Sequence, residues 1–391
     1  MGRMNEYVQR KLGANELENE LVRLISEYNK LQGTYLVVFV TSTQKRILEA
    51  QLDQDDYFMI ADMLSSQKGG DRLDFYIETP GGSGETAEEI VRFLHSNFTK
   101  VNFVVSGEAK SAGTIMVLSG HEIFMTDTGS LGPIDAQIYI GRSQSSAYDY
   151  MAWVEEKQEK AEATQSLNPF EAIMVAQISP GELNGVSNSL EFAKDLVVEW
   201  LTKYKFADWN ETAARKLPVT HEMKQNRAKE IADQLCNHAL WRSHGRSIKI
   251  IDLETIKLKV NRIDDNPAIA DIVYRIQTVC RLLFSSTTAY KIYATEHEKL
   301  FKHAVQAGLP SLSAPVLVDA VEINQVCPQC GTNHKIFCKL KPASKMNADH
   351  IKKGFIYYPK NDKLKCKCGF EIDLSGIRNQ IEMQIGKKII K

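Results

Sequence analysis

The sequence lacks the features that mark membrane and secreted proteins. It contains no uninterrupted apolar run of about eighteen residues, so no transmembrane helix is predicted. Its first residues, Met1 to Glu6, carry no apolar segment of a signal peptide, and Glu6 occupies the position where a myristoylation signal has serine or threonine. Without a secretory signal, disulfides are not expected among the seven cysteines. We therefore expect a cytoplasmic protein.

The sequence also lacks a net charge of either sign. Its 48 basic and 49 acidic residues give a formal charge of −1, so no field over the whole chain favours nucleic acid or membrane. With 391 residues, 43% hydrophobic and 25% charged, the composition is that of a globular protein with a sizeable core.

Two short motifs each follow an apolar, β-branched run and lead into a helical pattern. The first, Thr79-Pro80-Gly81-Gly82-Ser83-Gly84, follows Phe75–Ile77. The second, Lys110-Ser111-Ala112-Gly113-Thr114, follows Val101–Val105. Repeated strand, turn and helix units predict an α/β fold with a parallel sheet, in which both motifs lie at the carboxyl ends of strands.

The residue types in these motifs suit acyl transfer. A serine at a helix start exposes its hydroxyl, and the N–H of the next residue, Ala112, points into the same space. The N–H of Gly82 would be a second donor, and two such donors stabilise the negative charge that develops on a carbonyl oxygen during attack. Either motif alone is also a common turn or helix cap, so it is their pairing that favours the chemical interpretation.

Together with Thr128-Gly129-Ser130-Leu131-Gly132-Pro133-Ile134-Asp135, the two motifs resemble the serine dehydrogenase proteinase family of the Clp and signal-peptide-peptidase-A superfamily. The resemblance extends more weakly through Trp241–Ile248. It implies a Clp- or crotonase-like core of repeated ββα units and a closed homo-oligomer. It also implies that Ser111 is the nucleophile and that the N–H groups of Gly82 and Ala112 form the oxyanion hole.

The catalytic base is where the chain departs from the Clp peptidases. Those enzymes carry a histidine downstream of the serine, in the neighbourhood where this chain reads Gly132 to Asp135. The related signal-peptide-peptidase enzymes use a lysine from a later helix instead, which implies a Ser-Lys dyad. Lys157 and Lys160 fit that position, and Lys157 falls on an apolar stripe that would desolvate it and lower its pKa. We therefore predict a Ser111–Lys157 dyad.

Alternatives to Lys157 as the catalytic base stay open. Lys160 and His244 are alternative bases, and the lysines equally fit a solvated, charged helix surface. Lys110, next to the serine, is expected to shape the elbow or to contact substrate.

Two pairs of cysteines near the carboxyl end predict a zinc ribbon. They are Cys327-Pro328-Gln329-Cys330-Gly331 and Cys366-Lys367-Cys368-Gly369, in each of which a glycine permits a tight turn that brings two thiolates together. Four thiolates complete a closed, structural Zn²⁺ site. Cys338 and His334 are weaker alternative ligands, and Cys236 and Cys280 lie in apolar patterns that predict burial.

The segment from His334 to Lys391 is strongly basic, with fourteen Lys and Arg against five Asp and Glu. Aromatic residues lie among its lysines, notably Phe355, Tyr357 and Tyr358. This pattern predicts a nucleic acid or acidic protein partner, although a lysine-rich surface without a partner fits equally.

We expect four segments. Residues 1–32 form an amphipathic helix, which packs on its own sheet or on another subunit; residues 33–205 form the protease core; residues 206–318 form a helical extension, including a helical stretch at 268–305; residues 319–391 form the zinc-ribbon-like domain.

The predicted function is hydrolysis of peptide bonds through a Ser111 acyl-enzyme, with a protein or peptide as substrate. Two rivals remain. A crotonase-like acyl-CoA enzyme would use the paired N–H groups to stabilise a thioester enolate, and a catalytically silent scaffold would use the fold for assembly and the ribbon for binding.

Overall fold

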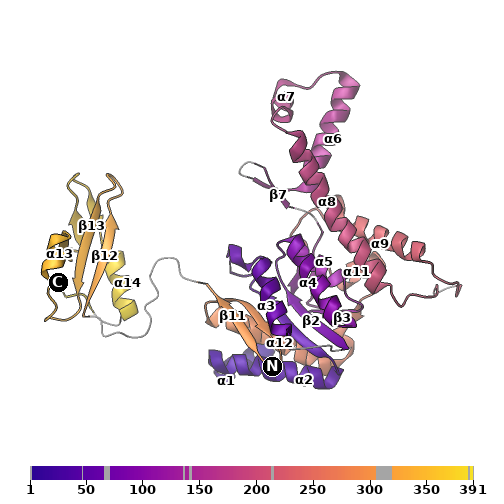
Figure 1. Cartoon of the computed structure of the whole chain (residues 1–391), viewed down its shortest axis with the longest axis horizontal. Coiled ribbons are helices and arrows are strands. Elements are labelled where there is room, and N and C mark those ends of the chain that lie inside the picture. The colour runs from indigo at the N-terminus through magenta and orange to yellow at the C-terminus, as the bar shows by residue number, and fades with distance from the viewer. Residues whose placement is uncertain are drawn as a thin grey trace. The chain divides into compact units, whose positions relative to one another are not determined.

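A computed structural model describes residues 2–45, 47–65, 71–134, 137–140, 143–212, 215–304, 319–385 and 388–390. The chain divides between residues 305 and 306 into two compact units, which we describe separately (Figure 1).

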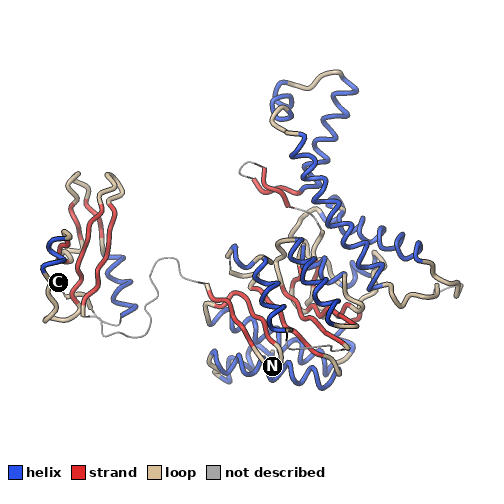
Figure 2. Tube along the Cα trace, viewed as in Figure 1, coloured by secondary structure: helices blue, strands red, loops and turns tan. Residues whose placement is uncertain are grey.

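The first unit is built on a sheet that contains seven of the described strands, in the order β11-β10-β1-β2-β3-β5-β9 (Figure 2). The strands from β1 to β9 in this order pair in parallel, and β10 and β11 extend the sheet antiparallel at one edge. Their bounds are β1 (Tyr35–Thr41), β2 (Arg72–Glu78), β3 (Lys100–Val105), β5 (Ile123–Met125), β9 (Asn261–Arg262), β10 (Ala289–Ala294) and β11 (Lys299–His303). The predicted parallel sheet is confirmed, and the carboxyl ends of β1, β2, β3 and β5 meet at one edge.

Helices cover both faces of this sheet, because alternate side chains of the strands point to opposite sides. Phe39 and Phe75 belong to the hydrophobic core on one face, and Val38 and Tyr76 belong to the core on the other. The first face is covered by α3 (Gln54–Leu64), α4 (Gly84–Asn97), α5 (Ala112–Leu118), α8 (Pro180–Trp200), α9 (His221–Cys236) and α11 (Ile250–Thr255). The second is covered by α1 (Arg3–Arg10), α2 (Ala14–Gln32) and α12 (Pro267–Ser286).

Short elements connect these layers. They are η1 (Leu48–Ala50), β4 (Glu108–Ala109), β6 (Ser130–Leu131), the π-helical turn η2 (Leu201–Lys205), α10 (His238–Trp241) and η3 (Ile263–Asp265).

A helical hairpin projects from the core of the first unit (Figure 1). It consists of α6 (Ala147–Thr164), α7 (Pro169–Val175) and the first half of α8, and it follows the two-stranded β7 (Gln137–Ile140) and β8 (Ser143–Ser146). Within α6 only Ala147 is buried. The hairpin therefore contributes few buried side chains to the core of the first unit.

The expectation of a helical stretch over residues 268–305 is wrong beyond Ser286. Helix α12 ends there, and β10 and β11 follow. The segment Ala289–Ala294 alternates between the two faces of the sheet, because Tyr293 joins one core while Ile292 joins the other. This period of two, and pairing with the free edge of β1, favour a strand over a helix.

The second unit has its own small core. Its sheet contains β12 (Ala320–Val326), β13 (Asn333–Lys339) and β14 (Phe355–Tyr357), beside the hairpin β15 (Lys363–Lys365) and β16 (Glu371–Asp373) and the helices α13 (Ala348–Lys352) and α14 (Ser375–Ile385). Ile336, Leu364 and Leu374 are buried in its interior. The finer division of the chain into four segments stays a prediction. None of the helices in the described ranges is long and apolar enough to cross a bilayer.

The amino-terminal helix α2 packs on its own sheet and on α12, and Leu21, Leu24 and Ile25 are 0% exposed there. Leu21→Ala should therefore lower the free energy of unfolding by about 2–5 kcal/mol, the usual cost of a cavity in a core. Leu31 lies on the same helix but is 55% exposed, so Leu31→Ala should change that free energy by no more than about 0.5 kcal/mol. Denaturant titration of both variants checks this, and equal effects would contradict the packing.

Candidate active site

Ser111 occupies a strained turn between β4 and α5. Its φ of +49° and ψ of −117° are rare for a residue with a side chain. The turn is braced by Thr114, whose hydroxyl donates to the Ala109 carbonyl at 2.7 Å and accepts from the Gly132 N–H at 2.9 Å. Such a turn lifts the serine side chain out of the helix that follows it, as in a nucleophile elbow.

The glycine loop packs directly on this serine. Gly81 and Gly82 have φ values of +96° and +152°. A Cβ atom added to Gly81 would lie 2.7 Å from Ser111 Cβ, and one added to Gly82 would lie 2.4 Å from the Leu52 nitrogen. Both the backbone angles and the lack of space therefore require glycine at these two positions.

Two backbone N–H groups are left available beside Ser111. Leu52 donates its N–H to the Gly81 carbonyl at 2.8 Å, and the Gly82 N–H, on the opposite side of the same trans peptide, points away from Leu52. The Ala112 N–H belongs to the first turn of α5, where helices leave donors unsatisfied. Neither N–H donates a hydrogen bond to any residue that the structure describes.

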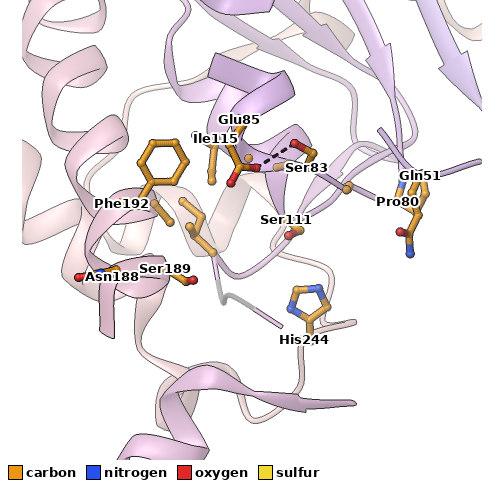
Figure 3. Close-up of a pocket in the computed structure, with 16 residues that line it drawn as sticks. Gln51, Pro80, Ser83, Glu85, Ser111, Ile115, Asn188, Ser189, Phe192 and His244 are labelled. Atoms are coloured by element: carbon orange, nitrogen blue, oxygen red, sulfur yellow. Dashed lines mark hydrogen bonds between the residues drawn. The ribbon is translucent and has the colours of Figure 1, made fainter. Parts of the chain in front are cut away.

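Gly82, Ser111 and Ala112 line one cavity of about 530 Å³ (Figure 3). This volume lies in the range of ligand sites. Ile115 and Phe192 give the cavity an apolar wall, and His244 lines it together with Ser111. Figure 3 shows Ser111 between the glycine loop and His244, with Phe192 across the cavity.

Lys110 ties the elbow to the segment that carries His244. It is only 7% exposed, and its ammonium donates to the Arg246 carbonyl at 3.0 Å, to Ser247 Oγ at 2.9 Å and to the Leu131 carbonyl at 3.2 Å. Burial lowers the pKa of Lys110. Lys110 thus shapes the elbow, which is one of the two roles expected for it.

The sequence profile of one protein family matches residues 59–276, which is more than half of the chain. That family is described as the ClpP-like SDH-type serine proteinases. The chain belongs to this family.

Two uncharacterized proteins of Methanocaldococcus jannaschii are similar to parts of this ClpP-like chain. One is 33% identical over 78 residues, which are 19% of this chain and 27% of the relative. The other is 29% identical over 116 residues, which are 30% of this chain and 37% of the relative. The chain thus spans well under half of the length of either curated relative.

Two solved structures are also similar, both of variants of the 1510-N membrane-bound stomatin-specific protease, and the second is in complex with a substrate peptide. Their sequence identities are 11% and 14%, and their TM-scores are 0.30 and 0.29. They cover 57% and 56% of this chain, and 79% and 70% of their own.

In this ClpP-like chain, Lys157 lies on the projecting hairpin. Its ammonium is 2.6 Å from a Glu156 carboxylate oxygen and 3.2 Å from one of Glu171, and Lys160 is 2.8 Å from Glu171. The hydrogen bond with Glu156 raises the pKa of Lys157, opposite to the lowering expected from its apolar stripe. Burial of Lys157 acts to lower its pKa, but this effect is smaller than that of the Glu156 hydrogen bond. No lysine is among the described residues that line the cavity.

Some of the residues that line the cavity are not marked by any motif or periodic pattern in the sequence. Asn188 and Phe192 come from α8, and Gln51 comes from the loop before α3. These contacts join segments far apart in the chain, so neither motif nor periodicity marks them. Asp135, the last residue of the third family motif, lies outside the described residues.

The four predicted cysteine ligands come together in the second unit. The sulfur atoms of Cys327, Cys330, Cys366 and Cys368 lie within 4.8 Å of one another and could hold a metal ion. The distances are 3.7 Å from Cys327 to Cys368 and 3.5 Å from Cys330 to Cys366. Four thiolates around one Zn²⁺, each bound at about 2.3 Å, would be about 3.8 Å apart, so the donor set fits this ion. Cys338 is buried outside the cluster.

Proposed function

We propose that this chain is a serine peptidase that hydrolyses peptide bonds through an acyl-enzyme on Ser111. The observation that carries the proposal is the strained turn at Ser111. Ser111 lines one cavity together with Gly82 and Ala112, whose N–H groups donate to none of the described residues. Membership of a serine proteinase family supports the same chemistry.

In the proposed reaction, Ser111 Oγ attacks the carbonyl carbon of the peptide while a base takes the hydroxyl proton. The carbonyl oxygen becomes negative and accepts hydrogen bonds from the N–H groups of Gly82 and Ala112. The tetrahedral intermediate then expels the amine, which takes up the proton, and leaves an ester on Ser111. Water hydrolyses that ester and regenerates the hydroxyl.

The conformation of Ser111 favours this function over both rivals. A crotonase-like acyl-CoA enzyme would need the two N–H groups but no serine, and a silent scaffold would need neither. A non-glycine residue with unfavourable backbone angles costs about 1–3 kcal/mol, and such strain is concentrated at functional sites. A nucleophilic serine accounts for strain at this position, whereas the rivals do not.

Ser111→Ala should abolish cleavage of fluorescein-labelled casein and labelling by a fluorophosphonate, because both require the hydroxyl. The unfolding transition should be unchanged. Ser189→Ala is the matched control, since Ser189 also lines the cavity but donates its hydroxyl hydrogen to Gly185 within α8. Full peptidase activity in the folded Ser111→Ala protein would contradict the proposal.

Three residues are candidates for the base: Lys157, Lys160 and His244. The Ser111–Lys157 dyad stays the prediction from the family resemblance, and it requires the ammonium to leave Glu156 and Glu171. His244 is the candidate that the structure favours. It lines the same cavity as Ser111, and it lies two residues before Arg246, whose carbonyl accepts a hydrogen bond from Lys110. We propose His244 on this ground.

His244→Gln should lower kcat for casein cleavage by about 10²–10⁴-fold, the usual contribution of a general base. Lys157→Met should leave kcat near that of the wild type, as should Lys160→Met, its neighbour in the same ion-pair cluster. The reverse pattern, loss in Lys157→Met and retention in His244→Gln, would establish the lysine dyad instead.

We further propose that the four cysteines hold one Zn²⁺ with a structural role. Four thiolates leave no open position for water, so the metal would stabilise the second unit and would not activate a nucleophile.

Protein purified anaerobically should contain about one zinc per chain by atomic emission, and Cys330→Ser should lose it because three thiolates bind zinc more weakly. Cys338→Ala is the control, since Cys338 lies outside the cluster, and it should keep its zinc. Metal-free wild-type protein would rule out the zinc site.

The predicted partner of the basic second unit remains a nucleic acid or an acidic protein. Two lysine–aromatic pairs on its sheet support this, with the Lys335 ammonium 5.9 Å from the Phe355 ring centre and that of Lys339 5.9 Å from the Tyr357 ring centre. The homo-oligomer and the cytoplasmic location also stay predictions.

A further inference from the structure

A buried ion pair lies next to the active site and has no part in the mechanism above. Lys291 on β10 and Asp56 on α3 are each 0% exposed. The Lys291 ammonium lies 2.9 Å and 2.8 Å from the two carboxylate oxygens of Asp56, and the Tyr293 hydroxyl donates to the same carboxylate. Burying two charges is costly, so a pair in this position calls for a specific role.

The ammonium makes a further contact, to the backbone beside the glycine loop. Lys291 Nζ donates to the Gln51 carbonyl at 2.7 Å. That carbonyl and the Leu52 N–H belong to one peptide group. Because a trans peptide is planar, its N–H points opposite to its C=O, and the Leu52 N–H donates to the Gly81 carbonyl at 2.8 Å.

The next peptide group, between Gly81 and Gly82, borders the cavity that Gly82 lines. The Gly81 carbonyl belongs to the same peptide group as the Gly82 N–H, which is one of the two proposed oxyanion donors. The chain of hydrogen bonds therefore runs from the Lys291 ammonium through the Gln51–Leu52 peptide and the Gly81–Gly82 peptide to the active site. Figure 3 shows Gln51 and Pro80 on the same side of Ser111.

The geometry has two physical consequences. Leu52 makes a second backbone hydrogen bond, because its carbonyl accepts from the Ser83 N–H at 2.9 Å. The two hydrogen bonds of Leu52 hold Gly81 and Ser83, the residues on either side of Gly82, and so fix the direction of the Gly82 N–H. In addition, the two peptide dipoles are aligned head to tail behind a positive charge. Hydrogen bonds in such a series polarise one another, which makes the last N–H a stronger donor.

We propose that Lys291 is a positioning residue of the oxyanion hole, which acts on the Gly82 N–H through this relay of two peptide groups. Asp56 holds the ammonium in place and balances its charge inside the protein. The proposal rests on the proposed serine peptidase function.

The test is the rate of inactivation by a fluorophosphonate, measured on the full chain as kinact and KI. Lys291→Met should lower kinact about tenfold, which is less than the 10²–10³-fold loss of an oxyanion donor, because the Gly82 N–H remains but is weaker and less firmly held. KI should change by less than about twofold, because the relay acts on the charge that develops during attack.

Three further variants separate the relay from a general effect on packing. Asp56→Asn keeps the ammonium, an amide oxygen that can accept its hydrogen bond, and the Asp53 carboxylate at 3.4 Å, so its kinact should fall by less than that of Lys291→Met. Lys291→Met combined with Asp56→Asn removes both charges and should show the same loss as Lys291→Met alone. Lys302→Met is the matched control, since Lys302 pairs with Asp55 of α3 at 3.3 Å but donates to no peptide of the relay, and it should label at the wild-type rate.

The outcomes are distinct. No labelling of Ser111 in the wild-type chain contradicts the proposed function itself. Normal wild-type labelling with an unchanged kinact in the folded Lys291→Met protein overturns the relay alone, as does an equal loss in Asp56→Asn. If Lys291→Met does not fold, the kinact of the double variant Lys291→Met, Asp56→Asn tests the relay in its place. If that variant also fails to fold, the pair serves stability and the relay is overturned.

Discussion

The active site depends on one backbone contact that continues the parallel pairing beyond the ends of β2 and β3. Thr79 receives a hydrogen bond from the Lys110 N–H at 3.0 Å and donates its own N–H to the Glu108 carbonyl at 2.7 Å. This bridge holds the glycine loop against the serine elbow so closely that only glycine fits at position 81. Backbone contacts therefore position the proposed nucleophile and the proposed oxyanion donors. Lys110 donates a hydrogen bond to the Arg246 carbonyl beside the elbow, and Lys291 donates one to the Gln51 carbonyl beside the glycine loop.

The sequence predicts the local parts of this arrangement well. Apolar runs that end in glycine or serine identify β2, β3 and the two turns, because these signals lie within a few residues of one another. The contribution of α8, and the contact of Lys291 with Gln51, join distant segments and have no local signature. The apolar stripe around Lys157 shows the limit of periodicity, since a stripe predicts a buried face without specifying what covers it.

The two units carry different kinds of chemistry. The first unit places a serine and two N–H donors in a cavity, and the second brings four cysteine side chains together beside its own small core. A closed four-thiolate site suits the stabilisation of a small fold, because a unit of this size buries little apolar surface. The proposed catalysis and the proposed metal binding thus depend on separate sets of contacts.

The most direct test of the account is a crystal structure of the chain after reaction with a fluorophosphonate. The account predicts a phosphorus–oxygen bond to Ser111, with one phosphonyl oxygen about 2.7–3.1 Å from the nitrogens of both Gly82 and Ala112. An adduct on a different residue, or a phosphonyl oxygen directed away from these two N–H groups, would contradict it.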